Sequence, residues 1–151
     1  MAITTAMCTS FKKEVLEAVH NFKNSGGDTF KIALYAISSG GKSSTTATLG
    51  AASTVFVTTG EVASSGSYVT GGGSLTRVDP TSAGTTGFTD FADFSFTTAT
   101  ITARGALIHN SSESNKAVCA LDFGGNKTST AGVFQIAFPA AAASTAIIRI
   151  A

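Results

Sequence analysis

Hydrophobic and polar positions alternate most clearly in the middle of the chain. Two apolar, β-branched runs at residues 101–108 and 117–123 flank a loop rich in Asn, Ser, Glu and Lys. From Cys119 onward every second residue of the later run is apolar, and the carboxylate of Asp122 falls on the opposite face, as in a half-buried strand. The pattern predicts a β-hairpin over residues 94–123, around which the rest of the chain is organised.

Shorter runs of alternating or β-branched residues predict the remaining strands. They cover residues 30–37, 54–59, 74–78, 93–97, 133–138 and 146–150. Glycine-rich or small-residue segments predict irregular connections between them. These connections are expected at residues 60–74, 124–132 and 139–145, with a turn that begins at Asp79-Pro80. With the hairpin, this makes about eight short strands.

One helix is predicted, over residues 9–24, with Thr9 or Ser10 as its N-cap. Apolar side chains recur there at helical spacing and form one stripe. The stripe consists of Phe11, Val15, Ala18, Val19 and Phe22. Gly26 and Gly27 are expected to end the helix. The stripe must be covered, either by the chain's own sheet or by another subunit.

The order of these elements predicts the fold class. No second amphipathic helix is present to cross between parallel strands, so the βαβ rhythm is missing. We therefore expect a mainly β fold, an antiparallel β-sandwich or jelly-roll-like domain with one N-terminal amphipathic helix. The predicted division is an N-terminal arm with the helix at residues 1–27 and a single β-domain at residues 28–151.

Composition narrows the classes of partner. Charged residues make up 13% of the chain, against roughly 25% in an average protein. There are 41 serine and threonine residues, so the surface is expected to be rich in hydroxyl groups. A net charge of +1 gives no electrostatic reason to expect nucleic-acid binding, which needs clustered Lys and Arg. No apolar run approaches the roughly 20 residues that span a bilayer, and no secretory signal pattern opens the chain, so neither membrane nor export is expected.

A relaxed phosphate-binding loop pattern occurs at residues 36–43, AISSGGKS. Such a loop works only where it enters a helix whose N-terminal amides hold the phosphates. Residues 44–48 are Ser, Thr, Thr, Ala and Thr, which give no apolar helical stripe. We therefore expect no nucleotide cofactor.

Histidine chemistry has little support in the sequence. His109 could act as a base beside Asp122 and a nearby serine, while His20 falls on the polar flank of the predicted helix. Because hydroxyl residues are so frequent, such a combination arises easily by chance, and the G-x-S-x-G nucleophile pattern is absent. No catalytic residues are expected.

Metal and disulfide chemistry is not expected either. The densest acidic group, Asp79, Asp90 and Asp93, is interleaved with phenylalanines and matches no calcium-loop pattern. Cys8 and Cys119 lack metal-ligand spacing and are expected to be two reduced thiols, with Cys119 acting as a small buried hydrophobe.

Several segments nevertheless suggest a relative. Taken in order along nearly the whole chain, they resemble small virion structural proteins of tailed bacteriophages. The segments are SFKKEVLEAVHNF, TFKIALY, TTGEV, SYVTGGGSL, ITARGALIHN, ALDFGG, FQIAFP and the terminal AIIRIA.

This resemblance implies a non-enzymatic head decoration (cement) protein, located in the virion and made in the host cytoplasm. Its partners would be the major capsid protein or other virion proteins, together with copies of itself, with a trimer favoured. Nucleic acid, membrane and cofactors play no part in this expectation. The candidate interface comprises Phe11, Val15, Val19, Phe22 and Tyr68. The alternative is a receptor- or glycan-binding module of a tail fibre or baseplate, with the segment around Tyr68 as the contact loop.

Overall fold

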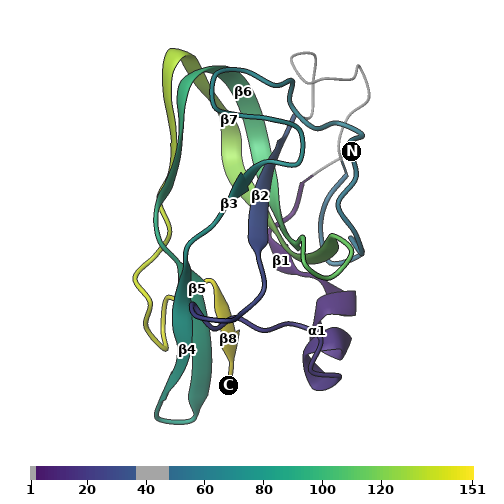
Figure 1. Cartoon of the computed structure of the whole chain (residues 1–151), viewed down its shortest axis with the longest axis vertical. Coiled ribbons are helices and arrows are strands. Elements are labelled where there is room, and N and C mark those ends of the chain that lie inside the picture. The colour runs from purple at the N-terminus through teal and green to yellow at the C-terminus, as the bar shows by residue number, and fades with distance from the viewer. Residues whose placement is uncertain (1–2, 37–47) are drawn as a thin grey trace.

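Two antiparallel sheets and one short helix make up the computed structural model, which describes residues 3–36 and 48–151 (Figure 1). The five-stranded sheet has the order β1-β7-β6-β2-β3, and the three-stranded sheet has the order β4-β5-β8. The first sheet contains β1 (Ala6–Met7), β2 (Phe30–Tyr35), β3 (Gly73–Ser74), β6 (Phe94–Asn110) and β7 (Lys116–Ile136). The second contains β4 (Arg77–Ala83), β5 (Thr86–Phe91) and β8 (Ile148–Ile150), and the helix is α1 (Thr9–Leu16). The predicted fold class, a mainly β, sandwich-like antiparallel arrangement with one N-terminal helix, is confirmed.

The predicted central hairpin forms the middle of the larger sheet. β6 and β7 pair antiparallel, from Asn110 with Lys116 at the turn to Phe94 with Ile136 at the far end. Both strands are longer than expected, and residues 124–132, predicted as a loop, lie inside β7. The glycine-rich segment is accommodated by repeated register shifts along the pair, because bulges absorb extra residues without ending a ladder.

The β6–β7 ribbon bends over the top of the molecule and returns down its side (Figure 1). Thr98 and Ala131 both have positive φ, 52° and 45°, at the bend. The pairing shifts register between Phe96 and Ala99 and again before Ile101. Bulges increase local twist and bend the strand that carries them, which explains how one hairpin turns back at the top of the molecule.

Two other local predictions are wrong. Asp79-Pro80, expected to begin a turn, lies inside β4 at a register shift between Val78 and Thr81. β4 is an edge strand, and proline is tolerated at an edge or a bulge because no ladder hydrogen bond is lost there. Residues 54–59, expected as a strand, contribute only one isolated bridge, from Val55 to Lys116.

The helix is half as long as predicted. It ends at Leu16 because Ala18 adopts a left-handed φ of 57°, whereas Gly26 and Gly27 lie in the loop that follows. The Val19 N–H donates to the Glu14 carbonyl at 3.0 Å and the Ala18 N–H donates to the Val15 carbonyl at 3.1 Å. These two bonds form a Schellman motif with alanine at the position that glycine normally occupies. The N-cap is Cys8, without a side-chain capping bond, in place of Thr9 or Ser10.

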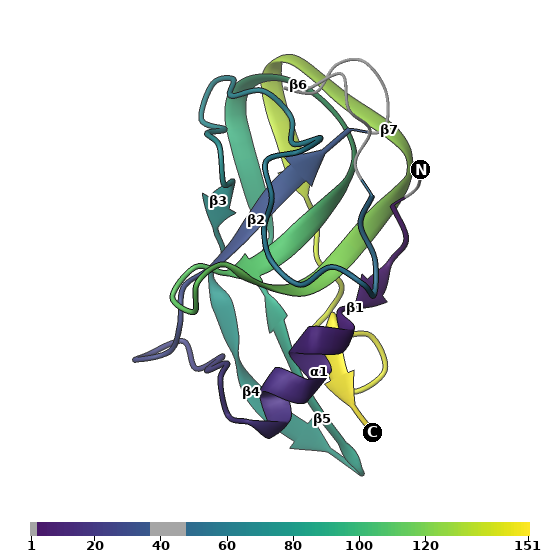
Figure 2. The same ribbon diagram turned by 90° about the vertical axis from the view of Figure 1, so that its right-hand side faces the viewer.

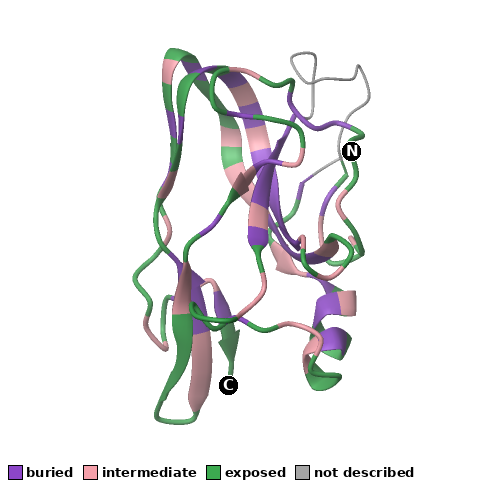
Figure 3. Ribbon diagram, viewed as in Figure 1, coloured by how far each residue is buried: buried purple, intermediate pink, exposed green. Residues whose placement is uncertain are grey.

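Most buried residues lie on β2 and on the inner parts of β6 and β7, whereas the tip of the β4–β5 hairpin is exposed (Figure 3). Aromatic rings connect the N-terminal segment to this core. Phe22 stacks on Phe30 with ring centroids 4.3 Å apart, and Phe11 meets Phe22 edge-on at 5.9 Å. The N-terminal segment therefore packs on residues of the predicted β-domain, while its separate folding as an arm stays a prediction.

Candidate functional site

An apolar cavity of about 220 Å³ lies between α1 and the three-stranded sheet, and we call it the helix groove. Figure 2 shows α1 beside β5 and β8 at this end of the molecule. Side chains of the N-terminal segment form one wall, and side chains of β5 and β8 form the other. They include Phe11, Val15, Phe22, Phe88, Ile148 and Ile150.

Apolar surface and an open strand edge occur together beside the helix groove. Ile150 of β8 lines the groove and is 57% exposed. β8 pairs with β5 alone among the described strands, so its other edge offers backbone donors and acceptors. Exposed apolar side chains beside an open edge are typical of surfaces that another protein covers.

The structure brings three of the five predicted interface residues to the helix groove. Phe11 and Phe22 are buried, Val15 is half-buried, and all three line it. Val19 is half-buried outside the lining. Of the predicted helical stripe, Phe11 and Val15 lie on α1, and the other residues follow its end. This chain covers the two phenylalanines and leaves Val15 and Val19 half-buried.

A polar network that the sequence did not reveal closes the back of the helix groove. The side chain of His20 is wholly buried, and its Nε2 lies 2.8 Å from Glu14 Oε2. Asn110 Nδ2 donates to His20 Nδ1 at 3.0 Å and to Asp28 Oδ2 at 2.8 Å. His20 Nδ1 is therefore an acceptor, and its Nε2–H donates to Glu14. His20 turns inward because the helix ends before it, so the only sequence signal was a histidine just beyond an apolar stripe.

Glu14 joins the helix to the central hairpin. One of its oxygens accepts from His20, and the other accepts from Lys116 Nζ at 3.3 Å. Burial raises the pKa of the Glu14 carboxyl, but these two hydrogen bonds outweigh burial and hold the pKa below its ordinary value. Both ring nitrogens of His20 and both oxygens of Glu14 are thus engaged, which fixes the wall of the groove.

Tyr68, the fifth predicted interface residue, lies in the core with no exposed surface. Its hydroxyl donates to Glu61 Oε1 at 2.9 Å and accepts the Leu34 N–H at 2.9 Å. Glu61 Oε1 also accepts the Gly71 N–H at 2.6 Å. Burial raises the pKa of Tyr68 strongly. The segment at residues 60–72 is therefore anchored through its tyrosine, and another of its residues, Val69, faces solvent with 58% exposure.

The structure does not bring His109 and Asp122 together: His109 pairs with Ala117 in the β6–β7 ladder, whereas Asp122 pairs with Gly105. His109 Nε2 donates to the Gly71 carbonyl at 3.1 Å, and its ring stacks on Phe56 with centroids 4.7 Å apart. Asp122 instead pairs with Arg104 at 2.8 Å, and this bond lowers the pKa of the Asp122 carboxyl. Each side chain thus has its own structural partner.

The remaining motifs fall elsewhere. Of the phosphate-binding pattern at residues 36–43, all but Ala36 lie outside the described residues. Asp90 and Asp93 accept backbone N–H groups, and Cys8 and Cys119 are free, buried thiols. Within residues 3–36 and 48–151, no three metal-ligating side chains gather at one point. No helix in that part of the chain is long and apolar enough to span a bilayer.

No protein-family model, curated protein sequence or solved structure matches this chain.

Proposed function

We propose that this protein is a non-enzymatic structural component of a tailed-phage virion, a head decoration (cement) protein that acts through protein–protein contacts. The observation that carries the proposal is the helix groove, an apolar cavity beside the open edge of β8. The resemblance of the sequence to small phage virion proteins supplies the class of partner. A low density of charge also suits a surface that neighbouring subunits cover.

The groove suits binding by an extended segment of the major capsid protein or of a second copy. A backbone that pairs with β8 presents alternate side chains to the groove, as in other cases of strand addition. Filling the groove with one aliphatic or aromatic side chain removes apolar surface from water, which is worth about 1.5–3 kcal/mol per side chain. A symmetric phage head repeats such contacts many times, and together they stabilise the head without any catalytic step.

Binding to heads assembled without this protein tests the proposal. Purified protein is mixed with such heads, and bound copies are counted by cryo-EM and by co-sedimentation. Ile150→Glu places a charge at the mouth of the groove, whereas Val69→Glu alters an equally exposed valine on another segment. We expect the wild-type and Val69→Glu proteins to bind, and Ile150→Glu to bind at least tenfold more weakly. Absence of wild-type protein from the heads would count against the proposal.

The alternative function is a receptor- or glycan-binding module of a tail fibre or baseplate. It is favoured by the segment around Tyr68, which is firmly anchored through Glu61 and presents Val69 to solvent. Tyr68 itself is buried and cannot stack on a sugar in this conformation. A glycan array without hits, together with labelling confined to heads, would remove this alternative.

A further inference from the structure

Apolar and charged side chains alternate along β8 at the open edge of the three-stranded sheet. Ile148 and Ile150 line the helix groove, whereas Arg149 between them is exposed and lies outside the lining. Successive side chains of a strand point to opposite faces of the sheet, so Arg149 belongs to the face that turns away from the groove. A segment that pairs with β8 therefore meets apolar surface on one face and a cation on the other.

Arg149 is the only exposed charge among the described residues of β5 and β8. The other charged residue of the two strands, Asp90, is buried and accepts two backbone N–H groups. Arg149 Nη1 donates to the Ser144 carbonyl at 2.7 Å, which restrains the guanidinium. In the part of the chain that the structure describes, no carboxylate forms an ion pair with Arg149. Its remaining donors are therefore available to a partner.

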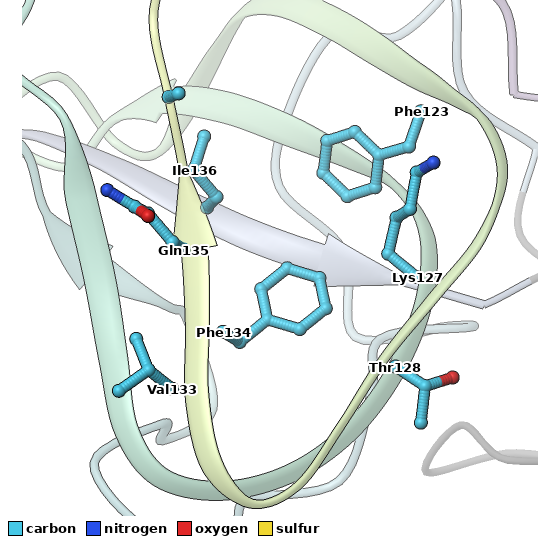
Figure 4. Close-up of a pocket in the computed structure, with 8 residues that line it drawn as sticks. Phe123, Lys127, Thr128, Val133, Phe134, Gln135 and Ile136 are labelled. Atoms are coloured by element: carbon cyan, nitrogen blue, oxygen red, sulfur yellow. The ribbon is translucent and has the colours of Figure 1, made fainter.

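The open edge of β7 lacks this combination. Among the described strands, β7 pairs with β6 along its length and with β1 only at Cys119 and Ala120. Where β7 bends, Phe123 and Phe134 already contact one another, with ring centroids 6.3 Å apart, and the exposed Lys127 lies beside Phe123 (Figure 4). Lysine on an edge strand discourages pairing with another chain. The edge of β8, beside an apolar groove, is the better binding surface.

A second copy of β8 is a poor occupant of this edge. In the antiparallel register that places Ile148 of each copy opposite Ile150 of the other, Arg149 lies directly opposite Arg149. Like charges opposite one another on paired strands destabilise the pair, whereas opposite charges stabilise it. The partner strand should therefore carry an acidic residue at this position.

We propose that the open edge of β8 binds an extended segment of another protein in which one acidic residue lies between two apolar residues. The apolar side chains enter the helix groove beside Ile148 and Ile150, and the carboxylate pairs with Arg149. Backbone pairing supplies affinity and the alternating side chains supply specificity, as in other cases of strand addition. This inference rests on the proposed function, because it names the kind of capsid segment that the groove binds.

NMR titration of the ¹⁵N-labelled full chain tests the charge preference. The probes are acetylated and amidated pentapeptides, Thr-Val-X-Val-Thr, in which X is Glu, Gln or Lys. We expect the Glu peptide to shift the amide resonances of Ile148, Arg149 and Ile150 in a saturable manner. It should bind about fivefold more tightly than the Lys peptide, with the Gln peptide between them, because the pair with Arg149 changes from attraction to repulsion.

Reversing the charge at Arg149 should reverse the order of the peptides. Arg149→Glu is expected to bind the Lys peptide more tightly than the Glu peptide, and Arg149→Gln to bind the two alike. Lys127→Glu makes the same kind of charge change on the exposed edge of β7 and is expected to keep the wild-type order. Equal binding of the peptides by the wild-type protein, an unchanged order in Arg149→Glu, or no saturable shift at millimolar peptide would overturn the inference.

Heads assembled without this protein separate this inference from the proposed function. If the wild-type protein and Arg149→Glu bind the heads equally well, the capsid segment has no acidic residue opposite Arg149, and the inference fails while the proposed function stands. If the wild-type protein does not bind heads but prefers the Glu peptide, the proposed function fails and the specificity of the β8 edge is supported.

Discussion

Asn110 Nδ2 donates a hydrogen bond of 3.0 Å to His20 Nδ1, across 90 residues of sequence. The same amide nitrogen donates to Asp28, and the amide oxygen accepts from the Ser112 and Glu113 N–H groups. One buried side chain therefore connects the segment after α1, the segment before β2 and the turn of the central hairpin.

Replacing Asn110 with alanine is expected to lower the free energy of unfolding by about 2–4 kcal/mol, because several buried groups lose their partners at once. Urea denaturation measures the loss. Ser111→Ala is the matched control, since the exposed Ser111 hydroxyl makes a single bond, to the Thr29 carbonyl, and its loss should cost less than about 1 kcal/mol. Equal effects of the two substitutions would show that the Asn110 network contributes little.

Ala18→Gly is expected to stabilise the protein by about 0.5–1 kcal/mol. Ala18 has a φ of 57° at the end of α1, a conformation that costs an L-residue energy and that glycine adopts freely. A rise in the thermal midpoint measures the gain. Lys12→Gly, inside the helix and exposed, is the control and should lower stability by about 1 kcal/mol. A destabilised Ala18→Gly variant would contradict the Schellman geometry.

Gly72 and Gly71 are expected to respond very differently to alanine. Both have positive φ, but a Cβ at Gly72 would collide with the backbone carbonyl of Ile32, whereas a Cβ at Gly71 meets nothing within 4 Å. Gly72→Ala must displace the pairing of β2 with β3 and should cost about 3 kcal/mol or more, against about 1–2 kcal/mol for Gly71→Ala. Chemical denaturation of the two variants side by side checks the difference.

Stability is expected to fall as the pH drops below 6.5, through His109. Burial lowers the pKa of His109, Lys31 lowers it further, and the bond to the Gly71 carbonyl only partly offsets these effects. Because the folded-state pKa lies below the ordinary value of 6.5, this contribution is complete above pH 6.5. It is lost as the pH falls toward the folded-state pKa, since the unfolded chain takes up the proton first.

His109→Gln keeps a donor for the Gly71 carbonyl but does not titrate. The slope of unfolding free energy against pH, measured between about pH 7 and pH 5, should therefore be smaller in this variant than in the wild-type protein. The comparison uses the slope, so a lower absolute stability does not obscure it. Identical slopes would exclude His109 as the source.

Local patterns predicted the hairpin, strand β2 and the start of α1 because alternation and helical spacing report which faces are buried. The patterns failed where a residue adopts a backbone conformation or position that its type usually avoids. Ala18 ends the helix with a left-handed φ, and Pro80 lies at a bulge of an edge strand. Neither event has a residue signature, because both depend on what packs nearby.

The sequence predicted one of the two walls of the helix groove. The apolar spacing of Phe11, Val15 and Phe22 identified one wall, but Ile148 and Ile150 come from a strand more than 120 residues away. Register between distant strands is set by the pairing of β5 with β8, which no short window of sequence contains. The length of β7 was missed as well, since residues 124–132 were expected to be a loop.

The pairing of Gly87 with Ile150 also has a consequence for the order of folding. The β6–β7 hairpin closes a short turn, so it can form early, whereas β8 must wait until its distant partner strand is in place. The amides of β8 should therefore exchange with deuterium sooner than those of β6, through openings that leave the hairpin intact. The groove exists only while β8 is paired with β5. A partner bound in the groove would therefore slow the opening of β8, and the amides of β8 would then be among the slowest in the protein to exchange with deuterium.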